Sequence, residues 1–289
     1  MEKMIGEVAL VEGQWKRDVW SHNLLEEIEL IKQCLSEFPI VAIDTEFPGF
    51  LRWTPKGVSD EEFYECLQFN VNRLSILQLG LTLTNDNGKI GMTWEFNFQD
   101  FDKISNMEGV YSLDSFLKNK GFNFNTLRSY GIAPQEFGKQ FNHILRSGKI
   151  QRWITFHGWY DIAYLMKFTY LRCMPTSMSM FAISAAHILG TVTDLKHMAR
   201  YSNNLLNGNL GLKRLAKLLQ VNRTGTAHFA GSDSLLTAAI YAKMKIIMKV
   251  EPKIHEGFLY GLPYPIQGYR RPVVIVDPSK LTDGRISTD

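Results

Sequence analysis

The stretch Ile40-Val41-Ala42-Ile43-Asp44-Thr45-Glu46-Phe47-Pro48-Gly49 decides the fold, because its apolar half has to lie at the centre of a sheet. Its first four residues are apolar and mostly β-branched, which is typical of a strand buried on both faces. Asp44 and Glu46 follow, and residues two apart on a strand point the same way. Pro48 has no N–H to donate and Gly49 permits a turn, so we expect the strand to end there.

The two carboxylates of this stretch would repel each other. Two like charges 4 Å apart cost roughly 4 kcal/mol at an effective dielectric constant near 20. A bound cation would relieve that repulsion. Two solvated side chains in a loop would also explain the pair, because Asp-x-Glu arises by chance in a chain of this length and charge content. The pair alone leaves both interpretations open.

The composition is that of a globular protein with a large core. The chain has 289 residues, of which 45% are hydrophobic, so it allows one large domain or two small ones. No apolar run reaches the ~18 residues of a membrane span, and the first residues lack the apolar core of a signal peptide. The widely spaced Cys34, Cys66 and Cys173 argue against a disulfide framework or a thiolate zinc site and favour a reducing compartment.

The charge is distributed unevenly between the two halves of the chain. Residues 1–150 contain 15 Lys and Arg against 21 Asp and Glu, a balance of −6, whereas residues 151–289 contain 17 against 8, a balance of +9. A basic half favours a polyanionic partner such as nucleic acid. A solubilising surface is the alternative, and charge alone does not separate the two.

The first half of the chain predicts an antiparallel start to a sheet. The pattern Ser59-Asp60-Glu61-Glu62 is a capping box that opens a helix, and Asn85-Asp86-Asn87-Gly88 is typical of a hairpin turn. The expected elements are helices over 23–38 and 59–71 and strands over 40–43, 74–84 and 90–98.

The second half changes to alternating helices and short strands. The expected helices are 134–145, 160–170, 176–189, 195–201 and 232–250, and the expected strands are 153–156 and 191–193. Three antiparallel strands followed by this alternation predict an α/β fold, a mixed sheet with parallel strands in its second part and helices on both faces.

Two later segments contain the residue types that could complete a metal site. Asp161 follows the strand at 153–156 and enters the first turn of a helix, and Asp233 occupies the same position in the last long helix. Either acid could simply favour the helix dipole, which is worth roughly 0.3–1 kcal/mol. His228 lies in the loop before Asp233, where an exposed loop histidine is the ordinary interpretation.

The set is more specific than its members. Carboxylate oxygens are hard ligands suited to Mg²⁺ or Mn²⁺ rather than zinc. Two such ions ~3.5–4 Å apart can hold a phosphodiester for hydrolysis. A neutral histidine can act as general base, because its unperturbed pKa is near 6.5. Asp44, Glu46, Asp161, His228 and Asp233 follow each other in the order of the DEDDh nucleases.

The chain resembles the DEDDh deadenylase subunit of the CCR–NOT complex, of the Caf/Pop type, and looks like a plant member. The resemblance extends over about residues 19–262. The Phe-Pro-Gly after Glu46 separates this family from proofreading DNA exonucleases. The most specific segments are 44–49, 70–80, 94–98 and 230–237.

The resemblance implies a ribonuclease-H-like fold over residues 14–262, followed by an extended tail over 263–289. It implies 3′-to-5′ removal of poly(A) tails from mRNA with release of AMP and with two Mg²⁺ or Mn²⁺ ions. Asp44, Glu46, Asp161 and Asp233 would be metal ligands, and His228 would be the general base. The implied partners are the MIF4G domain of the NOT scaffold and a second deadenylase of the endonuclease/exonuclease/phosphatase type. The implied locations are the cytoplasm with its processing bodies and the nucleus.

Three positions depart from the family pattern. Trp159 replaces a small residue beside Asp161, Phe229 occupies a usual glutamine position, and Thr193 replaces a usual tyrosine before Asp194. None of these changes removes a predicted ligand. They put the rate and the recognition of the tail end in question, but not the reaction class.

Two further interpretations stay open. A non-catalytic adaptor could keep the fold while recruiting other subunits, although decayed nucleases usually lose a ligand. A DNA-trimming exonuclease would share the chemistry. A candidate surface for the RNA backbone consists of Lys196, Arg200, Lys213, Arg214 and Lys217, although a solvated basic face would have the same spacing.

Overall fold

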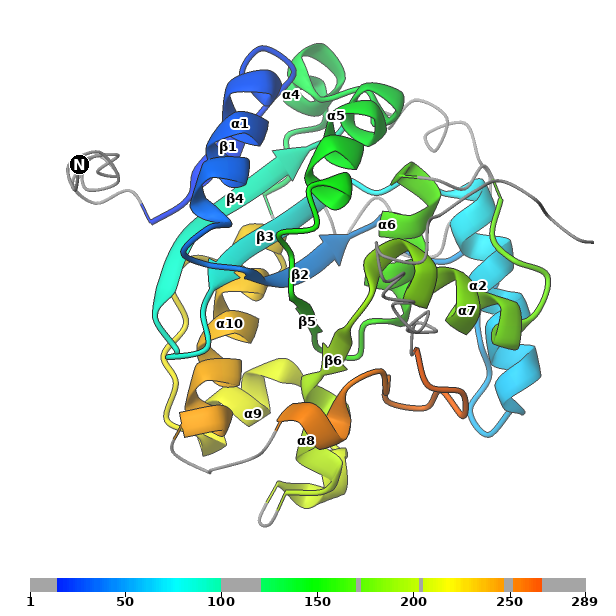
Figure 1. The fold of residues 1–289 in the computed structure, drawn as a ribbon. Helices are drawn as coiled ribbons and strands as arrows, with labels where there is room; N and C mark the ends of the chain where they lie inside the picture. Colours follow the sequence, from blue (N-terminus) through cyan, green and yellow to red (C-terminus); the bar gives the residue numbers. More distant parts are fainter. Residues whose placement is uncertain (1–14, 100–120, 170–172, 203–204, 247–251, 267–289) are drawn as a thin grey trace, which may run out of the picture.

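The structure is a computed structural model that describes residues 15–99, 121–169, 173–202, 205–246 and 252–266. Its centre is a sheet in the order β1-β4-β3-β2-β5-β6 (Figure 1). The strands are β1 (Arg17–Val19), β2 (Ile40–Glu46), β3 (Gln78–Thr84), β4 (Ile90–Asn97), β5 (Arg152–Thr155) and β6 (Val192–Asp194).

The pairing confirms the predicted mixed sheet. β3 runs antiparallel to both β2 and β4, and the 85–88 turn joins β3 to β4 as expected. β5 and β6 continue the sheet in parallel from β2. β1 was not predicted, because a strand of three residues is too short to show a period; it pairs in parallel with β4, and Val19 is its buried residue.

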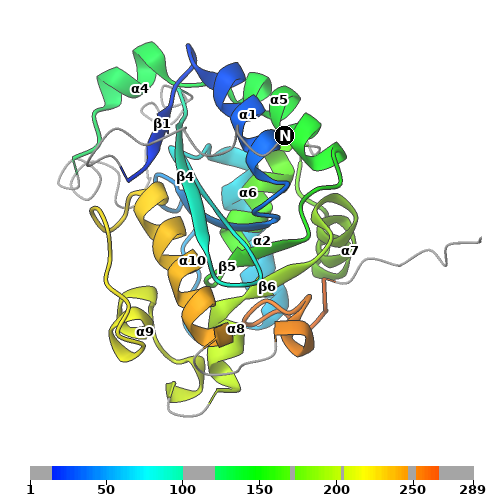
Figure 2. The same cartoon turned by 60° about the vertical axis from the view of Figure 1, so that its left-hand side comes forward.

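Helices cover both faces of the sheet, and Figure 2 shows α10 on one side with α1, α5 and α6 on the other. α4 and α9 were not predicted, and the first helix ends at Cys34 rather than at residue 38. The helices are α1 (Leu24–Cys34), α2 (Asp60–Arg73), α4 (Phe124–Tyr130), α5 (Pro134–Arg146), α6 (Trp159–Thr169), α7 (Met178–Leu189), α8 (Leu195–Arg200), α9 (Leu212–Leu218) and α10 (Ala230–Ile246), with short 3-10 turns at Leu206–Gly208 and Pro252–His255.

Strand β2 is buried on both faces, as its sequence predicts. Val41 and Ile43 pack into the core cluster that includes residues of α1, α5 and α6. Ile40 and Ala42 pack into the opposite cluster with residues of α8, α9 and α10. The alternation continues past the apolar half, so Asp44 and Glu46 belong to the face that α10 covers.

Several helix ends agree with the sequence. Ser59 and Glu62 form the predicted capping box of α2, and Gly190 follows the last residue of α7. The last long helix starts at Ala230, two residues before its expected start. The predicted ends of two helices, at residue 170 and over 247–250, lie outside the described residues, as does the tail over 267–289. The domain boundaries at 14 and 262 stay predictions.

Among the described residues, none of the helices is both long enough and apolar enough to cross a lipid bilayer.

Candidate active site

The five residues singled out by the sequence come from three elements that meet at the end of β2. Asp44 and Glu46 are the fifth and seventh residues of this strand. Asp161 lies in the first turn of α6, and Asp233 lies in the first turn of α10. His228 lies in the loop that leads into α10. The amino ends of two helices therefore point toward one acidic strand end, and their dipoles favour negative charge there.

The side chains converge. Ligand atoms of Glu46, His228 and Asp233 all lie within 4.8 Å of one another. Asp44 is close enough to Asp161, Asp233 and Glu46 for their charges to act on it. We call Asp44, Glu46, Asp161 and Asp233 the acidic cluster. The structure thus brings all five predicted site residues together, and it places His228 within reach of the same cation as Glu46 and Asp233.

Burial and the repulsion between like charges raise pKa values in the acidic cluster. The pKa of Asp44 lies well above its ordinary value, first because burial disfavours the charged form and then because Asp161, Asp233 and Glu46 repel it. Burial likewise raises the pKa of Asp161 to about 7. Without a cation, the cluster therefore resists full ionisation at neutral pH.

Asp161 is tied to the end of β2. Its Oδ1 accepts hydrogen bonds from the backbone N–H of Thr45 at 2.8 Å and from the Thr45 hydroxyl at 2.7 Å. Thr45 points to the α6 side of the sheet, whereas its neighbours Asp44 and Glu46 point to the α10 side. These bonds fix Asp161 beside the strand and oppose the rise in its pKa.

Asp233 has a partner that the sequence analysis missed. Its Oδ2 accepts the backbone N–H of His228 at 2.8 Å, and its Oδ1 pairs with the Arg223 guanidinium at 2.5 Å. Arg223 also donates to the Ser232 hydroxyl at 3.1 Å. A single basic residue in the loop before α10 gives no spacing signal, so only the fold reveals this pairing. Arg223 supplies counter-charge to the acidic cluster.

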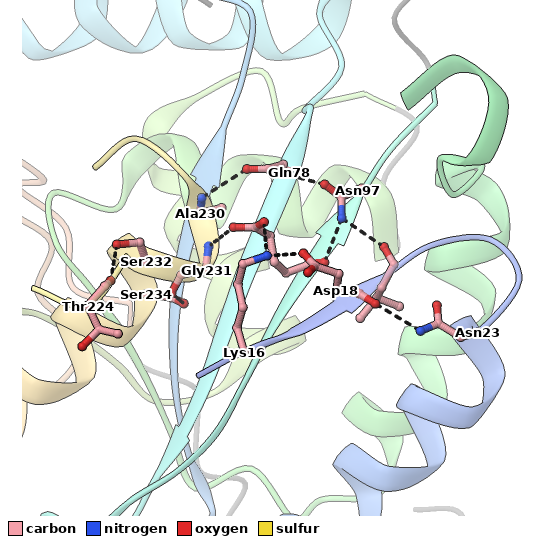
Figure 3. A network of polar contacts seen from close by, with 12 residues as sticks. Lys16, Asp18, Asn23, Gln78, Asn97, Thr224, Ala230, Gly231, Ser232 and Ser234 are labelled. Carbon is pink, nitrogen blue, oxygen red and sulfur yellow. Dashed lines mark hydrogen bonds and ion pairs between the residues drawn. The ribbon is translucent and has the colours of Figure 1, made fainter. Parts of the chain in front are cut away.

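The start of α10 is held against the sheet by a buried polar network, which Figure 3 shows. Gln78 accepts the backbone N–H of Ala230 at 3.3 Å, and Glu95 accepts that of Gly231 at 3.0 Å. Glu95 is paired with Lys16 at 2.8 Å. Gly80 on β3 allows the close approach, because a Cβ there would lie 1.8 Å from the Ala230 carbonyl oxygen. These contacts position Asp233, three residues from the helix start.

Asp194 is a further buried carboxylate near the site. It caps α8, since its Oδ1 accepts the N–H of Lys196 at 2.8 Å. That oxygen also accepts the N–H of His157 at 2.9 Å, and Oδ2 accepts those of Gly158 at 3.3 Å and Tyr260 at 3.1 Å. Asp194 therefore fixes the turn that leads into α6.

The three departures from the family pattern are packing residues. Trp159 is buried, donates its indole N–H to the Tyr260 carbonyl at 2.9 Å and stacks on Phe181. Phe229 stacks on Phe122 at 5.0 Å. Thr193 is buried within β6. The structure keeps Asp161 and His228 in the site despite these neighbours.

The predicted basic surface lies on α8 and α9. Lys213, Arg214 and Lys217 of α9 are exposed, as is Arg200 at the end of α8. Lys196 is partly buried, and its ammonium group lies 4.5 Å from the centre of the Tyr260 ring. α8 and α9 pack together with α10 on one side of the sheet, so these cations belong to that side of the molecule.

The donor set fits a hard divalent cation. Carboxylate oxygens with one imidazole suit Mg²⁺ or Mn²⁺, and the separation of the Glu46, His228 and Asp233 ligand atoms allows them to share an ion. Positive charge would also let the acidic cluster ionise. The geometry therefore supports metal-assisted hydrolysis of a phosphate ester.

Comparison with protein families gives one clear match. Residues 19–137 match the model of the CAF1 family ribonuclease. A protein of Arabidopsis thaliana described as a probable CCR4-associated factor 1 homolog, number 5, is 41% identical over 230 residues, which are 78% of this chain and 81% of that relative. Poly(A) ribonuclease pop2 of Schizosaccharomyces pombe is 36% identical over 239 residues, 79% of this chain and 69% of the relative.

Solved structures agree with the sequence comparison. The Mg²⁺- and Mn²⁺-bound form of S. pombe Pop2p matches with a TM-score of 0.77 and 32% identity over 86% of this chain and 100% of that one. CAF1 co-crystallised with the MIF4G domain of yeast NOT1 matches with a TM-score of 0.71 and 26% identity over 87% and 100% of the two chains. These matches confirm the ribonuclease-H-like fold that the resemblance implied.

Proposed function

Because the chain belongs to the CAF1 family of ribonucleases, we propose that it is a 3′-to-5′ exoribonuclease that shortens the poly(A) tails of mRNA and releases AMP. The observation that carries the proposal is the convergence of ligand atoms of Glu46, His228 and Asp233 within 4.8 Å of one another. Asp44 is close enough to Glu46 and Asp233 for their charges to act on its carboxylate. A chain that had lost the activity would have little reason to keep this set together.

The proposed ligands are the carboxylates of Asp44, Glu46, Asp161 and Asp233. Two Mg²⁺ or Mn²⁺ ions, when bound, would neutralise the scissile phosphate and the departing 3′ oxygen. Asp161 can offer Oδ2, because its Oδ1 accepts two bonds from Thr45. Since the S. pombe relative with the same fold was solved with Mg²⁺ and Mn²⁺, these are the ions we expect here.

His228 has the role of general base in this proposal. Its backbone N–H is anchored on Asp233, which fixes the residue at the edge of the acidic cluster. Its φ of 67° places it in the left-handed region, which a residue other than glycine adopts only where its surroundings hold it. The imidazole removes the proton from the attacking water, and the adjoining carboxylates orient that water.

The same family membership supports an assembly. We propose docking on the MIF4G domain of the NOT scaffold, because a relative with this fold was co-crystallised with that domain. Pairing with a second deadenylase of the endonuclease/exonuclease/phosphatase type is part of the proposal. The proposed locations are the cytoplasm, including processing bodies, and the nucleus.

The test is hydrolysis of 5′-labelled RNA that ends in twenty adenosines or twenty uridines, with purified full-length protein and Mg²⁺ or Mn²⁺. A ladder that shortens from the adenosine tail supports the proposal. Activity should vanish in EDTA and return with Mg²⁺ or Mn²⁺, and restoration by zinc alone would contradict the hard-ligand site. Cleavage of neither RNA would favour the adaptor, whereas preferential trimming of DNA would favour a DNA exonuclease.

A further inference from the structure

An aromatic cavity of about 240 Å³ is lined in part by Trp159 and Tyr160 of the first turn of α6. We call it the aromatic pocket, and its rings are those of Phe50, Trp53, Phe63, Trp159 and Tyr160. The proposed catalysis uses none of them. The volume is below the roughly 300–1,000 Å³ of pockets for drug-sized ligands, so the pocket suits a single ring system.

The aromatic pocket adjoins the acidic cluster through the chain itself. Tyr160 directly precedes Asp161, and Phe47 directly follows Glu46. The rings of Phe47 and Tyr160 stack on each other with their centres 4.8 Å apart. Tyr160 lines the pocket and Asp161 belongs to the cluster, so one wall of the pocket lies about 3.8 Å along the backbone from a proposed metal ligand.

One wall of the aromatic pocket is open to solvent. The Phe50 ring meets Tyr160 edge-on at 5.5 Å and Trp53 edge-on at 5.6 Å. The Trp53 side chain is 63% exposed, so a broad indole surface is accessible beside the cavity. An exposed tryptophan next to further rings is the arrangement on which nucleobases stack.

The loop that contains Phe50 and Trp53 is fixed before any ligand binds. The buried Asn70 of α2 accepts the backbone N–H groups of Leu51 and Arg52, each at 2.9 Å, and donates to the Arg52 carbonyl at 2.8 Å. It also donates to the Tyr160 hydroxyl at 3.3 Å. One amide thus ties the loop to the opposite wall, which lowers the entropy cost of binding.

The remaining residues that line the aromatic pocket are polar, and one of them lies near a lysine ammonium group. Thr54 and His157 can exchange hydrogen bonds with the edge of a base. His157 packs edge-on against Tyr260, and the ammonium group of Lys196 lies over the same Tyr260 ring. A cation close to the pocket favours a ligand that has phosphates attached to its ring.

We propose that the aromatic pocket is a stacking subsite for one nucleobase of the RNA, a base close to the phosphodiester that is cut. This inference rests on the proposed function for the identity of the ligand. Stacking on one aromatic side chain changes affinity by about 5- to 150-fold, so removing the Trp53 ring should weaken RNA binding by about tenfold. Purines should bind better than pyrimidines, because their stacking face is larger.

The test is the Kd of a fluorescently labelled RNA of ten adenosines for the full-length chain with Asp44→Ala, in Mg²⁺, so that the RNA stays intact. Trp53→Ala should raise the Kd about tenfold, and Trp53→Phe should restore most of the affinity. Tyr130→Ala, which removes a ring of similar exposure on α4, should leave the Kd unchanged. Equal thermal melting points for these variants exclude misfolding as the cause.

Abasic nucleotides placed one at a time along the RNA locate the stacked base. At one position of the RNA, loss of the base should raise the Kd of the chain that keeps Trp53. The same loss should not change the Kd of the Trp53→Ala chain. If the Kd is the same with and without the Trp53 ring, or if no RNA binding is measurable, the proposed subsite is wrong. Wild-type protein that shows the ring-dependent Kd but cuts no RNA overturns the proposed hydrolysis instead, and leaves the subsite standing.

Discussion

Asp194 at the end of β6 and the acidic cluster at the end of β2 place carboxylates at corresponding positions of one sheet, but their surroundings differ. Asp194 is fully buried and accepts four backbone N–H groups, two on each oxygen. In the acidic cluster, several carboxylates share a small volume, and burial together with the neighbouring charges raises the pKa of Asp44 and of Asp161. Asp194 is satisfied by backbone donors alone, whereas full ionisation of the cluster at neutral pH requires added positive charge, which the proposed metal ions would supply.

In both regions, a histidine with a left-handed backbone conformation precedes the helix. His157 precedes α6 and His228 precedes α10, and both have left-handed φ angles, of 60° and 67°. Each donates its backbone N–H to a carboxylate, His157 to Asp194 and His228 to Asp233. The difference between Asp194 and the proposed metal ligand Asp233 therefore lies in the donors that surround each carboxylate and not in the turn that precedes it.

The largest expected effect is on activity when the acidic cluster loses a member. Asp44→Ala should lower the rate of RNA hydrolysis by more than about 100-fold, because loss of an outer-shell partner of a metal already costs 10–100-fold. Its free energy of unfolding in EDTA should stay the same or rise, because like-charge repulsion is removed. Hydrolysis assays and urea unfolding measure the two. Substantial activity in excess Mg²⁺ would show that Asp44 is not a ligand.

Asp194→Asn should mainly lower the stability of the fold, in contrast to Asp44→Ala, which should mainly lower activity. The amide replaces one acceptor oxygen by a donor, so two of the four backbone N–H groups lose their partner. The expected destabilisation is about 2–5 kcal/mol, measured by urea unfolding. An Asp194→Asn chain as stable as the wild type would mean that the cluster and Asp194 do not differ as described.

The smallest effect is a pH dependence of stability in the metal-free protein. The pKa of Asp161 is about 7 in the folded chain and 3.8 for an ordinary aspartate. Between these values the folded chain keeps a proton that the unfolded chain has lost, so stability should fall as the pH rises from about 4 to about 7. The slope for one group is at most about 1.4 kcal/mol per pH unit.

Urea midpoints in EDTA at pH 5, 6 and 7 measure this slope. Mg²⁺ should cancel the loss near pH 7, because binding to the folded state alone adds stability by mass action. Asp161→Asn should reduce the slope of the EDTA curve, to which the raised pKa of Asp44 also contributes. Asp194→Asn should shift the curve and narrow the pH range of the fall, because the charge of Asp194 helps to raise the pKa of Asp161. A wild-type curve that is already flat in EDTA would refute the electrostatic difference between the two regions.

The sequence by itself determined most of the helices and strands and the candidate site residues. The apolar alternation around Ile43, the capping box at Ser59 and the turn at Asn85 are local patterns, and a local pattern fixes the backbone wherever the segment lies. The same holds for Asp161 and Asp233, whose positions in first helical turns could be read from their neighbours. The roles of these acids as ligands, and of His228 as base, stay predictions.

Only the tertiary structure decided which groups meet. The bond from Thr45 to Asp161 joins residues 116 apart in the chain, and no periodicity specifies such a contact. The pairing of Arg223 with Asp233, the four donors around Asp194 and the aromatic pocket that Asn70 holds in shape arise in the same way. The physical reason is that backbone hydrogen bonds and helix periods act over a few residues, whereas charge pairing and side-chain packing depend on which segments the sheet brings side by side.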